Sequence, residues 1–340
     1  DQSVAYITDV YARLDVSLSR DDVRGESAYN ENLDDIVTEL DAKGLLVDSA
    51  GALCVFPPGF VNRDGEPLPF IVRKSDEGYG YPATDLAAIR ERSADADLLL
   101  YVVGTPQSQH FEMLFAVARL AGWLDASVRA EHVSFGNVLG PDHKMLKTRT
   151  GENVRLVDLL DEAVERARAG LAERGAGSEG AERDALAASI ARAAIKYADL
   201  STERQRDYVF DLERMLSFEG DTGPYLQYAH ARVASIFRRL DAPWTGAPRF
   251  ALEHPAERDL ALGLLALPEA FGSALDANAP HRLCTYLFDL AQRFTAFYEA
   301  CPVLSSAGAT RDERLALCSL TARTLALGLS LLGVDAPDRM

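Results

Sequence analysis

The hydrophobic pattern of this chain changes its period near Leu156, and that change limits the possible folds more than any other feature. Before it, apolar β-like runs at 69–72 and 98–103 alternate with helical patterns such as 110–121, which predicts an α/β unit with a parallel sheet. After it, strand signals almost vanish and apolar residues recur at helical spacing, as in the segment 283–297. We therefore expect α/β structure followed by an all-α bundle.

Turn signals subdivide both halves. The run 52–56 follows the turn residues 48–51, which predicts a β-hairpin arm within an insertion at about 9–66. Because about sixty residues of such insertion-like sequence precede the first convincing sheet strand, we expect the chain to start in the middle of a nucleotide-binding domain. In the second half, Gly-rich or Pro-rich breaks occur at 175–180 and 242–248; the first is expected to be an exposed loop.

The charge balance restricts the partners. Lys and Arg total 35 against 52 for Asp and Glu, a net charge of -17, which argues against broad attraction to polyphosphate or to anionic membranes. Any nucleic-acid contact must use local basic patches, and toward the C-terminal end of the chain the one that stands out is Arg238-Arg239. With no run of eighteen apolar residues and no signal-peptide pattern at the start, we expect a soluble, cytoplasmic protein without a membrane partner.

The cysteines give no sign of a metal centre. Cys54, Cys284, Cys301 and Cys318 are widely spaced, without a C-x-x-C pair. Neither a zinc site nor a disulfide framework is indicated. We expect four buried thiols and no metal held by the protein.

A polar segment with two tyrosines follows the strand expected at 69–72 and leads into a helix. It comprises residues 73–88, and ligands of open α/β sheets bind at such carboxyl ends of strands. Taken alone, Thr84 or Asp85 is expected to cap the helix. Capping does not account for the tyrosines.

Two further junctions place polar groups directly after strands. The strand at 98–103 is followed by the amide of Gln107 and the imidazole of His110. The second junction, residues 132–151, combines glycines with three cations. The second pattern is typical of a loop that folds over phosphates. Ordinary loop polarity and a solvated basic loop are the alternative interpretations.

The longest motif lies within residues 194–232, where Gly-Asp-Thr-Gly-Pro opens an aromatic-rich helix. A structural interpretation makes Thr222 the cap and places Pro224 in the first turn. Taken together with the three junctions and with the ending at 333–340, however, the motif resembles the signature of the arginine–tRNA ligases, which are class I aminoacyl-tRNA synthetases. The resemblance covers essentially the whole chain.

The resemblance implies a domain order. Residues 1–150 are expected to be the C-terminal half of a Rossmann-type aminoacylation domain, with 151–220 as a connecting helical region and 221–340 as a helical anticodon-binding domain. The half of the sheet that bears the family's H-I-G-H motif has no counterpart here, so the missing N-terminal half of the enzyme is an expected partner.

The resemblance also implies roles for particular residues. By family spacing, Tyr81, Asp85 and Gln107 are expected to bind arginine. The loop at 144–149 matches the family's counterpart of the K-M-S-K-S loop. Lys144 and Lys147 stand at its two lysine positions and are expected to be the catalytic lysines. His132 and Gly136 are weaker candidates for contact with ATP.

The implied reaction joins L-arginine to tRNA(Arg) with ATP and Mg²⁺. The chain departs from the family pattern at Pro82, Gly104 and Pro106, and Pro82 restricts both its own φ and the residue before it, Tyr81. A noncatalytic tRNA-binding paralogue or fragment of the same family is therefore the alternative to an active ligase.

Overall fold

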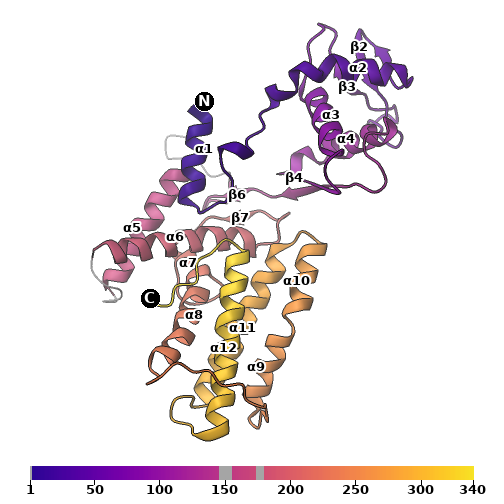
Figure 1. Ribbon diagram of the computed structural model, residues 1–340. Coiled ribbons are helices and arrows are strands. Elements are labelled where there is room, and N and C mark those ends of the chain that lie inside the picture. The colour runs from indigo at the N-terminus through magenta and orange to yellow at the C-terminus, as the bar shows by residue number, and fades with distance from the viewer. Residues whose placement is uncertain (1, 145–154, 174–179) are drawn as a thin grey trace. The chain divides into compact units, whose positions relative to one another are not determined.

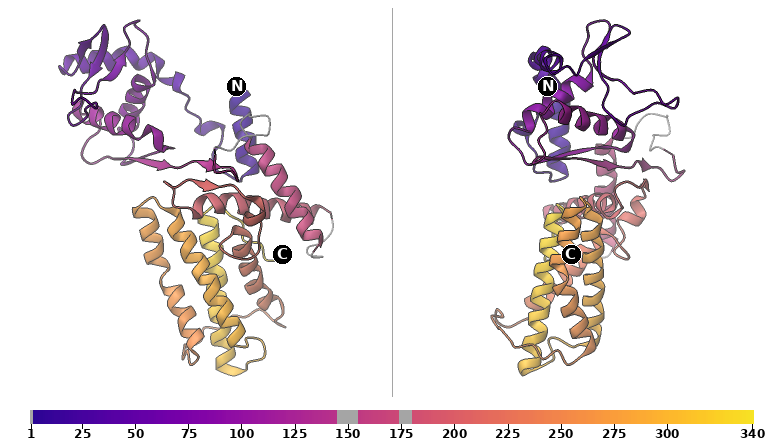
Figure 2. Two further views of the ribbon diagram at one scale, coloured as in Figure 1. Left: turned by 180° about the vertical axis from the view of Figure 1, so that it is seen from behind. Right: turned by 90° about the vertical axis from the view of Figure 1, so that its right-hand side faces the viewer.

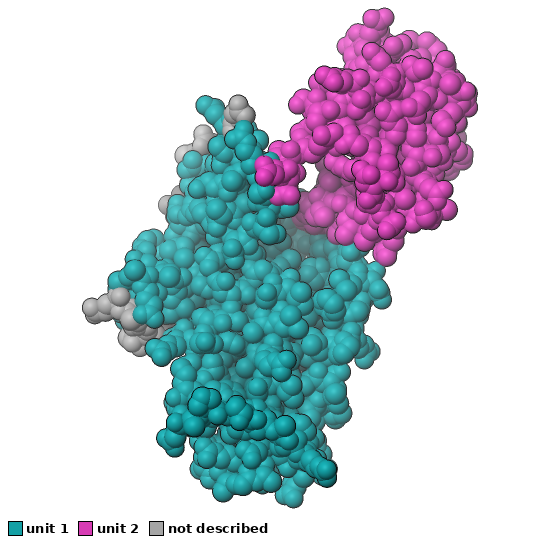
Figure 3. All heavy atoms as spheres, viewed as in Figure 1, with its two compact units in different colours: residues 1–20, 137–340 teal, residues 21–136 magenta. Residues whose placement is uncertain are grey.

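The computed structural model describes residues 2–144, 155–173 and 180–340 (Figure 1). The chain folds as two compact units, shown in different colours in Figure 3. Unit 1 comprises residues 1–20 and 137–340, and unit 2 comprises residues 21–136. The two units are defined by contacts within the fold. The predicted domain boundaries at 150 and 220 concern the functional role of each segment, and they stay predictions.

Unit 2 contains the predicted α/β structure. Strands β4 (Leu98–Gly104) and β5 (Arg129–Phe135) pair in parallel, and helix α4 (Ser108–Leu120) connects them. Helix α3 (Tyr81–Arg92) shares one core with α4 and with the buried side chains of β4, Leu99 and Tyr101. The expected helix between two parallel strands is confirmed.

The predicted hairpin is confirmed, but the strand at 69–72 has a different partner from the one expected. Strands β1 (Val47–Ser49) and β2 (Ala52–Val55) are antiparallel, and helix α2 (Leu33–Ala42) precedes them. Strand β3 (Phe70–Arg73) pairs antiparallel with β2 and not with the parallel sheet. Alternating burial along β3 fits a sheet with one face on the core. The apolar run therefore predicted the strand but not its neighbour.

From Leu156 onward the described residues are almost wholly helical, as predicted, and unit 1 also contains residues 1–20 and 137–144 from the half that was predicted to be α/β. A short parallel pair, β6 (Val138–Leu139) and β7 (Tyr208–Val209), supplements the helices. The helices are α1 (Gln2–Arg13), α5 (Leu156–Glu173), α6 (Ala181–Ser201), α7 (Leu212–Met215), α8 (Gly223–Arg238), α9 (Pro255–Leu265), α10 (Leu267–Asp276), α11 (Pro280–Ala300) and α12 (Gly308–Leu331). Helices α11 and α12 run side by side in both views of Figure 2. The break expected at 242–248 is confirmed as coil, and most of the break at 175–180 lies outside the described residues.

Helix α12 is long and apolar enough to span a membrane by length and composition alone. Half of its most apolar window is buried inside the bundle, where Leu317, Leu325 and Leu329 join the core formed with α8 and α11. Packing within the protein accounts for its apolar character. All four cysteines are free and buried, as predicted. Cys284, Cys301 and Cys318 belong to the bundle core, and Cys54 lies in β2 of unit 2.

The Gly-Asp-Thr-Gly-Pro motif fixes the start of α8 against α6. Thr222 Oγ1 accepts a hydrogen bond from the backbone N–H of Tyr225 at 3.2 Å, and Pro224 lies in the first turn, so the predicted cap is confirmed. A Cβ atom on Gly223 would lie 2.3 Å from the carbonyl oxygen of Ala193 in α6. Only glycine permits this approach of the two helices.

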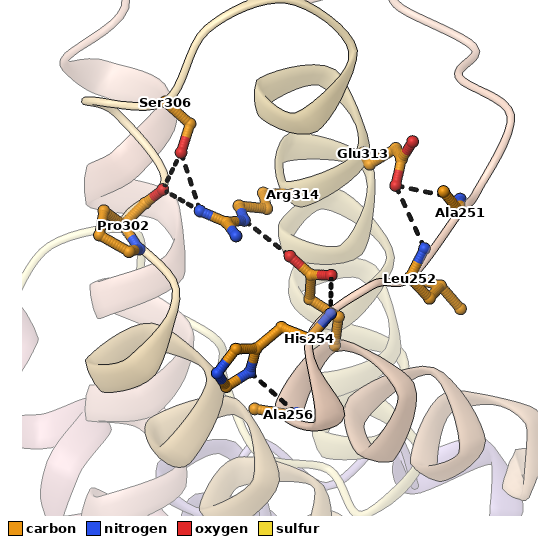
Figure 4. Close-up of polar contacts among 9 residues, drawn as sticks. Ala251, Leu252, His254, Ala256, Pro302, Ser306, Glu313 and Arg314 are labelled. Atoms are coloured by element: carbon orange, nitrogen blue, oxygen red, sulfur yellow. Dashed lines mark hydrogen bonds and ion pairs between the residues drawn. The ribbon is translucent and has the colours of Figure 1, made fainter.

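An ion pair between the buried Glu257 and the partly buried Arg314 closes the end of the bundle where α12 begins (Figure 4). Glu257 Oε1 accepts a hydrogen bond from Arg314 Nε at 2.7 Å, and Arg314 also donates to the carbonyl oxygen of Pro302 at 2.9 Å. The second carboxylate oxygen of Glu257 accepts from the backbone N–H of His254 at 3.0 Å. The pair therefore holds the first turn of α9 to α12 and to the connection that precedes α12.

We predict that Gly223→Ala destabilises unit 1 by about 1–3 kcal/mol, because α8 must move away from α6 to admit the methyl group. The measurement is the free energy of unfolding in urea. Gly272→Ala is the matched control: Gly272 lies within α10 with open space around its Cβ position, so alanine should leave stability unchanged or raise it by up to about 1 kcal/mol. Equal effects of the two substitutions would contradict the close-packing argument.

The Glu257 pair should make bundle stability sensitive to acid. Burial opposes ionisation of this carboxyl, but the His254 backbone amide and Arg314 hold the pKa of Glu257 below its usual value. A carboxyl with a lower pKa in the folded state stabilises the fold above its unfolded pKa, about 4.3. That stabilisation is lost as the pH falls through the folded-state pKa.

We therefore expect wild-type unfolding free energy to fall more steeply below about pH 4.3 than that of Glu257→Gln, which is already less stable at neutral pH. Urea titrations from about pH 7 to about pH 3 provide the measurement. Parallel pH profiles for the two proteins would show that the ion pair adds no acid sensitivity.

Candidate functional site

Helix α3 begins at Tyr81, directly after Gly80, whose backbone is extended (φ -120°, ψ 177°). Pro82 lies in the first turn, where a fixed φ suits the helix and the missing N–H costs no hydrogen bond. The prediction that Thr84 or Asp85 caps the helix is therefore wrong, because both residues lie inside it. Since residues four apart share one helix face, Tyr81 and Asp85 lie on the same side of α3.

His110, from α4, joins that face. Its Nε2 atom lies 2.7 Å from Asp85 Oδ2. Its ring stacks on Phe70 with 5.6 Å between centroids and meets the edge of Tyr81 at 4.8 Å. Only 12% of the His110 side chain is exposed, against 33% for Asp85, and 59% of Tyr81 is exposed. The sequence predicted His110 as a neighbour of Gln107 but gave no sign of its contact with Asp85.

The charge of Asp85 acts in partly desolvated surroundings. Burial raises the pKa of the nearby Tyr101 hydroxyl above its usual value, and the charge of Asp85 raises that pKa further. Arg92, whose guanidinium lies 5.8 Å from the Tyr101 ring centroid, acts in the opposite direction. A cation that approaches Asp85 here is attracted more strongly than in water, because less solvent screens the charges.

Gln107 ends the 3-10 turn η3 (Thr105–Gln107), which follows β4 directly. The Thr105 hydroxyl donates to the carbonyl oxygen of Phe135 at 3.0 Å, and this bond ties the turn to the end of β5. The exposed Gln107 side chain therefore lies at the carboxyl edge of the parallel pair, where ligands of such sheets bind.

His132 in β5 has structural partners. Its Nε2 atom lies 2.9 Å from the carbonyl oxygen of Val103, which can only accept, so this nitrogen donates. Its ring stacks on Phe111 with 4.7 Å between centroids. These contacts join β5 to β4 and α4. A role of His132 on the ATP side stays a prediction, as does that of Gly136, the last residue of unit 2.

Lys144 lies after β6, in unit 1, and ends a tight turn. Its carbonyl oxygen accepts from the backbone N–H of Gly140 at 2.7 Å, and its own N–H donates to Asp142 Oδ1 at 3.2 Å. The side chain is exposed. Lys147 and the rest of the loop expected at 144–149 lie outside the described residues. A phosphate-binding role for this loop stays a prediction.

Two family models match the chain in the order of its two halves. Residues 1–212 match the catalytic domain of the class I (R) tRNA synthetases, and residues 226–340 match the DALR anticodon binding domain. The chain belongs to the class I arginyl-tRNA synthetase family. The resemblance drawn from the motifs is thereby confirmed, together with the predicted order of a class I catalytic region and a helical anticodon-binding domain.

Individual synthetases agree with this assignment. The chain is 53% identical to the arginine–tRNA ligase of Frankia casuarinae, with 97% of this chain and 57% of that protein covered. It is 51% identical to that of Thermobifida fusca, with 99% and 59% covered. The crystal structure of arginyl-tRNA synthetase from Plasmodium falciparum matches all of the chain and 57% of its own, with a TM-score of 0.85 and 31% identity. The chain thus spans 57–59% of the length of these relatives.

Proposed function

We propose that this synthetase chain takes part in the ATP-dependent attachment of L-arginine to tRNA(Arg) through an arginyl-adenylate. It supplies the arginine pocket, the phosphate loop and the anticodon-binding domain. One observation carries the proposal: Asp85 is held by His110 beside the exposed ring of Tyr81, within the region that matches the class I (R) catalytic domain.

The proposed pocket suits a guanidinium group. A carboxylate accepts two parallel, charge-assisted N–H bonds from a guanidinium. Lysine lacks the planar fork of donors, and citrulline lacks the positive charge. His110 acts as a positioning residue, because its bond to Oδ2 limits rotation of the Asp85 carboxylate. The exposed ring of Tyr81 offers a face for the cationic plane. Gln107 provides an amide for the polar groups of the amino acid.

On the ATP side, Lys144 and Lys147 of the loop stabilise the negative charge of the triphosphate during adenylation, and His132 and Gly136 border the nucleotide. Positioning and charge stabilisation carry this chemistry. Within the described ranges, no three His, Cys, Asp or Glu side chains are grouped to hold a metal ion. We propose that Mg²⁺ arrives with the phosphates of ATP.

A further stretch of synthetase sequence is a proposed partner of unit 2. Leu98, Leu100 and Val102 of β4 are 47%, 44% and 65% exposed, although parallel sheets are normally covered on both faces. The longer relatives contain sequence beyond the matched region. We propose that the N-terminal half of the enzyme, with the remainder of the ATP site, covers this apolar face.

These assignments give each segment of the chain a proposed role. We propose that residues 1–150 serve the aminoacylation site, that 151–220 connect, and that 221–340 read the anticodon. The proposed location is the cytoplasm, where tRNA is charged, and the proposal includes no membrane partner.

Asp85→Asn tests the arginine pocket in the full-length enzyme. Loss of one partner of a partly buried charge pair should lower kcat/KM for arginine activation by about 30-fold to several thousand-fold. Because Asp85 is not a helix cap, the melting temperature should stay within a few degrees of wild type. The measurement is arginine-dependent exchange of pyrophosphate into ATP, with thermal melting alongside.

Asp76→Asn is the matched control, since Asp76 belongs to the same segment and, within the described part of the chain, accepts only a local bond from the backbone N–H of Gly78. We expect it to leave arginine kinetics within about threefold of wild type. Asp85→Asn kinetics within the same range would refute the role of Asp85. A wild-type enzyme that binds tRNA(Arg) but forms no adenylate would instead support the noncatalytic alternative.

A further inference from the structure

The Asp85 carboxylate of α3 has one partner, His110 of α4, among the residues that the structure describes. Its Oδ2 atom lies 2.7 Å from His110 Nε2. In the same part of the chain, no Lys or Arg forms an ion pair with Asp85, and no hydrogen bond engages its other oxygen, Oδ1. Within the described ranges, His110 is thus the side chain placed to neutralise Asp85.

The contact with Asp85 fixes which nitrogen of the His110 ring carries the hydrogen. An ionised carboxylate only accepts hydrogen bonds, so Nε2 donates, and the lone pair of the neutral ring lies on Nδ1. Across the described residues no hydrogen bond engages Nδ1, and this atom is not among the buried side-chain atoms that lack a partner there, so water reaches it. A proton can therefore bind at Nδ1 while the bond to Asp85 persists.

Aromatic rings surround the His110 imidazole. Phe70 of β3 stacks on it with 5.6 Å between centroids, and Tyr81 and Phe111 meet it in T-shaped contacts at 4.8 and 5.3 Å. Only 12% of the His110 side chain is exposed. A charge on this ring is therefore screened weakly from Asp85 and from any cation that approaches Asp85.

The titratable groups that touch His110 or the Phe111 ring beside it are Tyr81 and Asp85 of α3, Tyr101 of β4 and His132 of β5. Farther along α3, Arg92 lies over the rings of Tyr29 and Tyr101. Glu112 of α4 is exposed, and Arg73 of β3 lies on the opposite face of its strand from Phe70. Histidine is the side chain that ordinarily changes charge between about pH 5 and pH 8. A change of charge here in that range therefore belongs to His110 or to His132.

We propose that His110 makes arginine binding depend on a proton: neutral His110 leaves the charge of Asp85 to the substrate guanidinium, whereas protonated His110 neutralises Asp85 and repels that guanidinium. The guanidinium of arginine keeps its charge throughout this range, so the pH dependence arises in the protein. Arginine and the proton then compete, binding strengthens as the pH rises, and each binding event releases a proton. The inference rests on the proposed function, because it takes Asp85 as the guanidinium acceptor.

The first test is calorimetric binding of L-arginine to the full-length enzyme from about pH 8 to about pH 5.5, the range in which histidine titrates. Affinity should fall at least about tenfold toward the acid end, because like charges oppose each other across a weakly screened distance. Titrations in two buffers with different heats of ionisation should show release of up to about one proton per arginine bound, at the pH values where affinity falls.

His110→Gln separates the proton from the hydrogen bond. The glutamine amide can still donate to Asp85 but takes up no proton in this range. Its arginine affinity should stay within about threefold across the same pH values, without proton release. His132→Gln is the matched comparison, because it removes the other imidazole that contacts Phe111, and it should leave the proton release unchanged.

Constant wild-type affinity across the range, or arginine binding without proton release, overturns the inference. So does a proton release that His132→Gln abolishes and His110→Gln retains. A purely structural role of His110 would lower the affinity of His110→Gln by one factor at every pH and leave its profile parallel to that of wild type. If His110→Gln unfolds, the proton release by wild type and by His132→Gln still decides.

Asp85→Asn separates this inference from the proposed function. Arginine binding that depends on Asp85 but not on pH defeats only the inference. Wild-type arginine affinity in Asp85→Asn defeats the proposed pocket itself, whatever the pH profile.

Discussion

The close approach of α6 and α8 at Gly223 is the contact on which the helical half depends. Behind it lies the fully buried Tyr197 of α6, whose hydroxyl is 2.6 Å from Asp221 Oδ1 and 3.1 Å from the carbonyl oxygen of Cys284 in α11. Burial raises the pKa of both Tyr197 and Asp221 above their usual values. These two hydrogen bonds join α6 to α11 and to the segment that leads into α8. The bond to Cys284 also connects the segments matched by the two family models.

Helix α6 also fixes both ends of the described chain. The Asp335 carboxylate contacts Ser189 and Arg192 of α6, and Gln227 of α8 donates to its backbone carbonyl at 3.0 Å. Lys196 Nζ donates to the carbonyl oxygen of Leu14, just after α1, at 2.8 Å. These bonds explain why residues 1–20 belong to the helical unit although they precede the α/β unit in sequence.

The candidate site shows which features the local sequence predicts and which it does not. The family spacing paired Tyr81 with Asp85, and the structure adds that both lie on one face of α3. The polar junction after β4 singled out Gln107, which lies at the carboxyl edge of the parallel pair. The expected cap was misplaced because Thr84 and Asp85 are good capping residues by type, while Pro82 sets the helix start a turn earlier. The partner of Asp85 could not be predicted, because His110 reaches it only through the packing of α4 on α3.

The sequence by itself determined the succession of α/β and all-α structure, the hairpin arm, the cap of α8 and the synthetase family. Those properties follow from hydrophobic periods, turn residues and motifs that neighbouring residues set among themselves. Only the tertiary structure decided that β3 pairs with β2 and that His110 holds Asp85. Such contacts depend on which surfaces pack together, and packing joins residues that no local pattern relates.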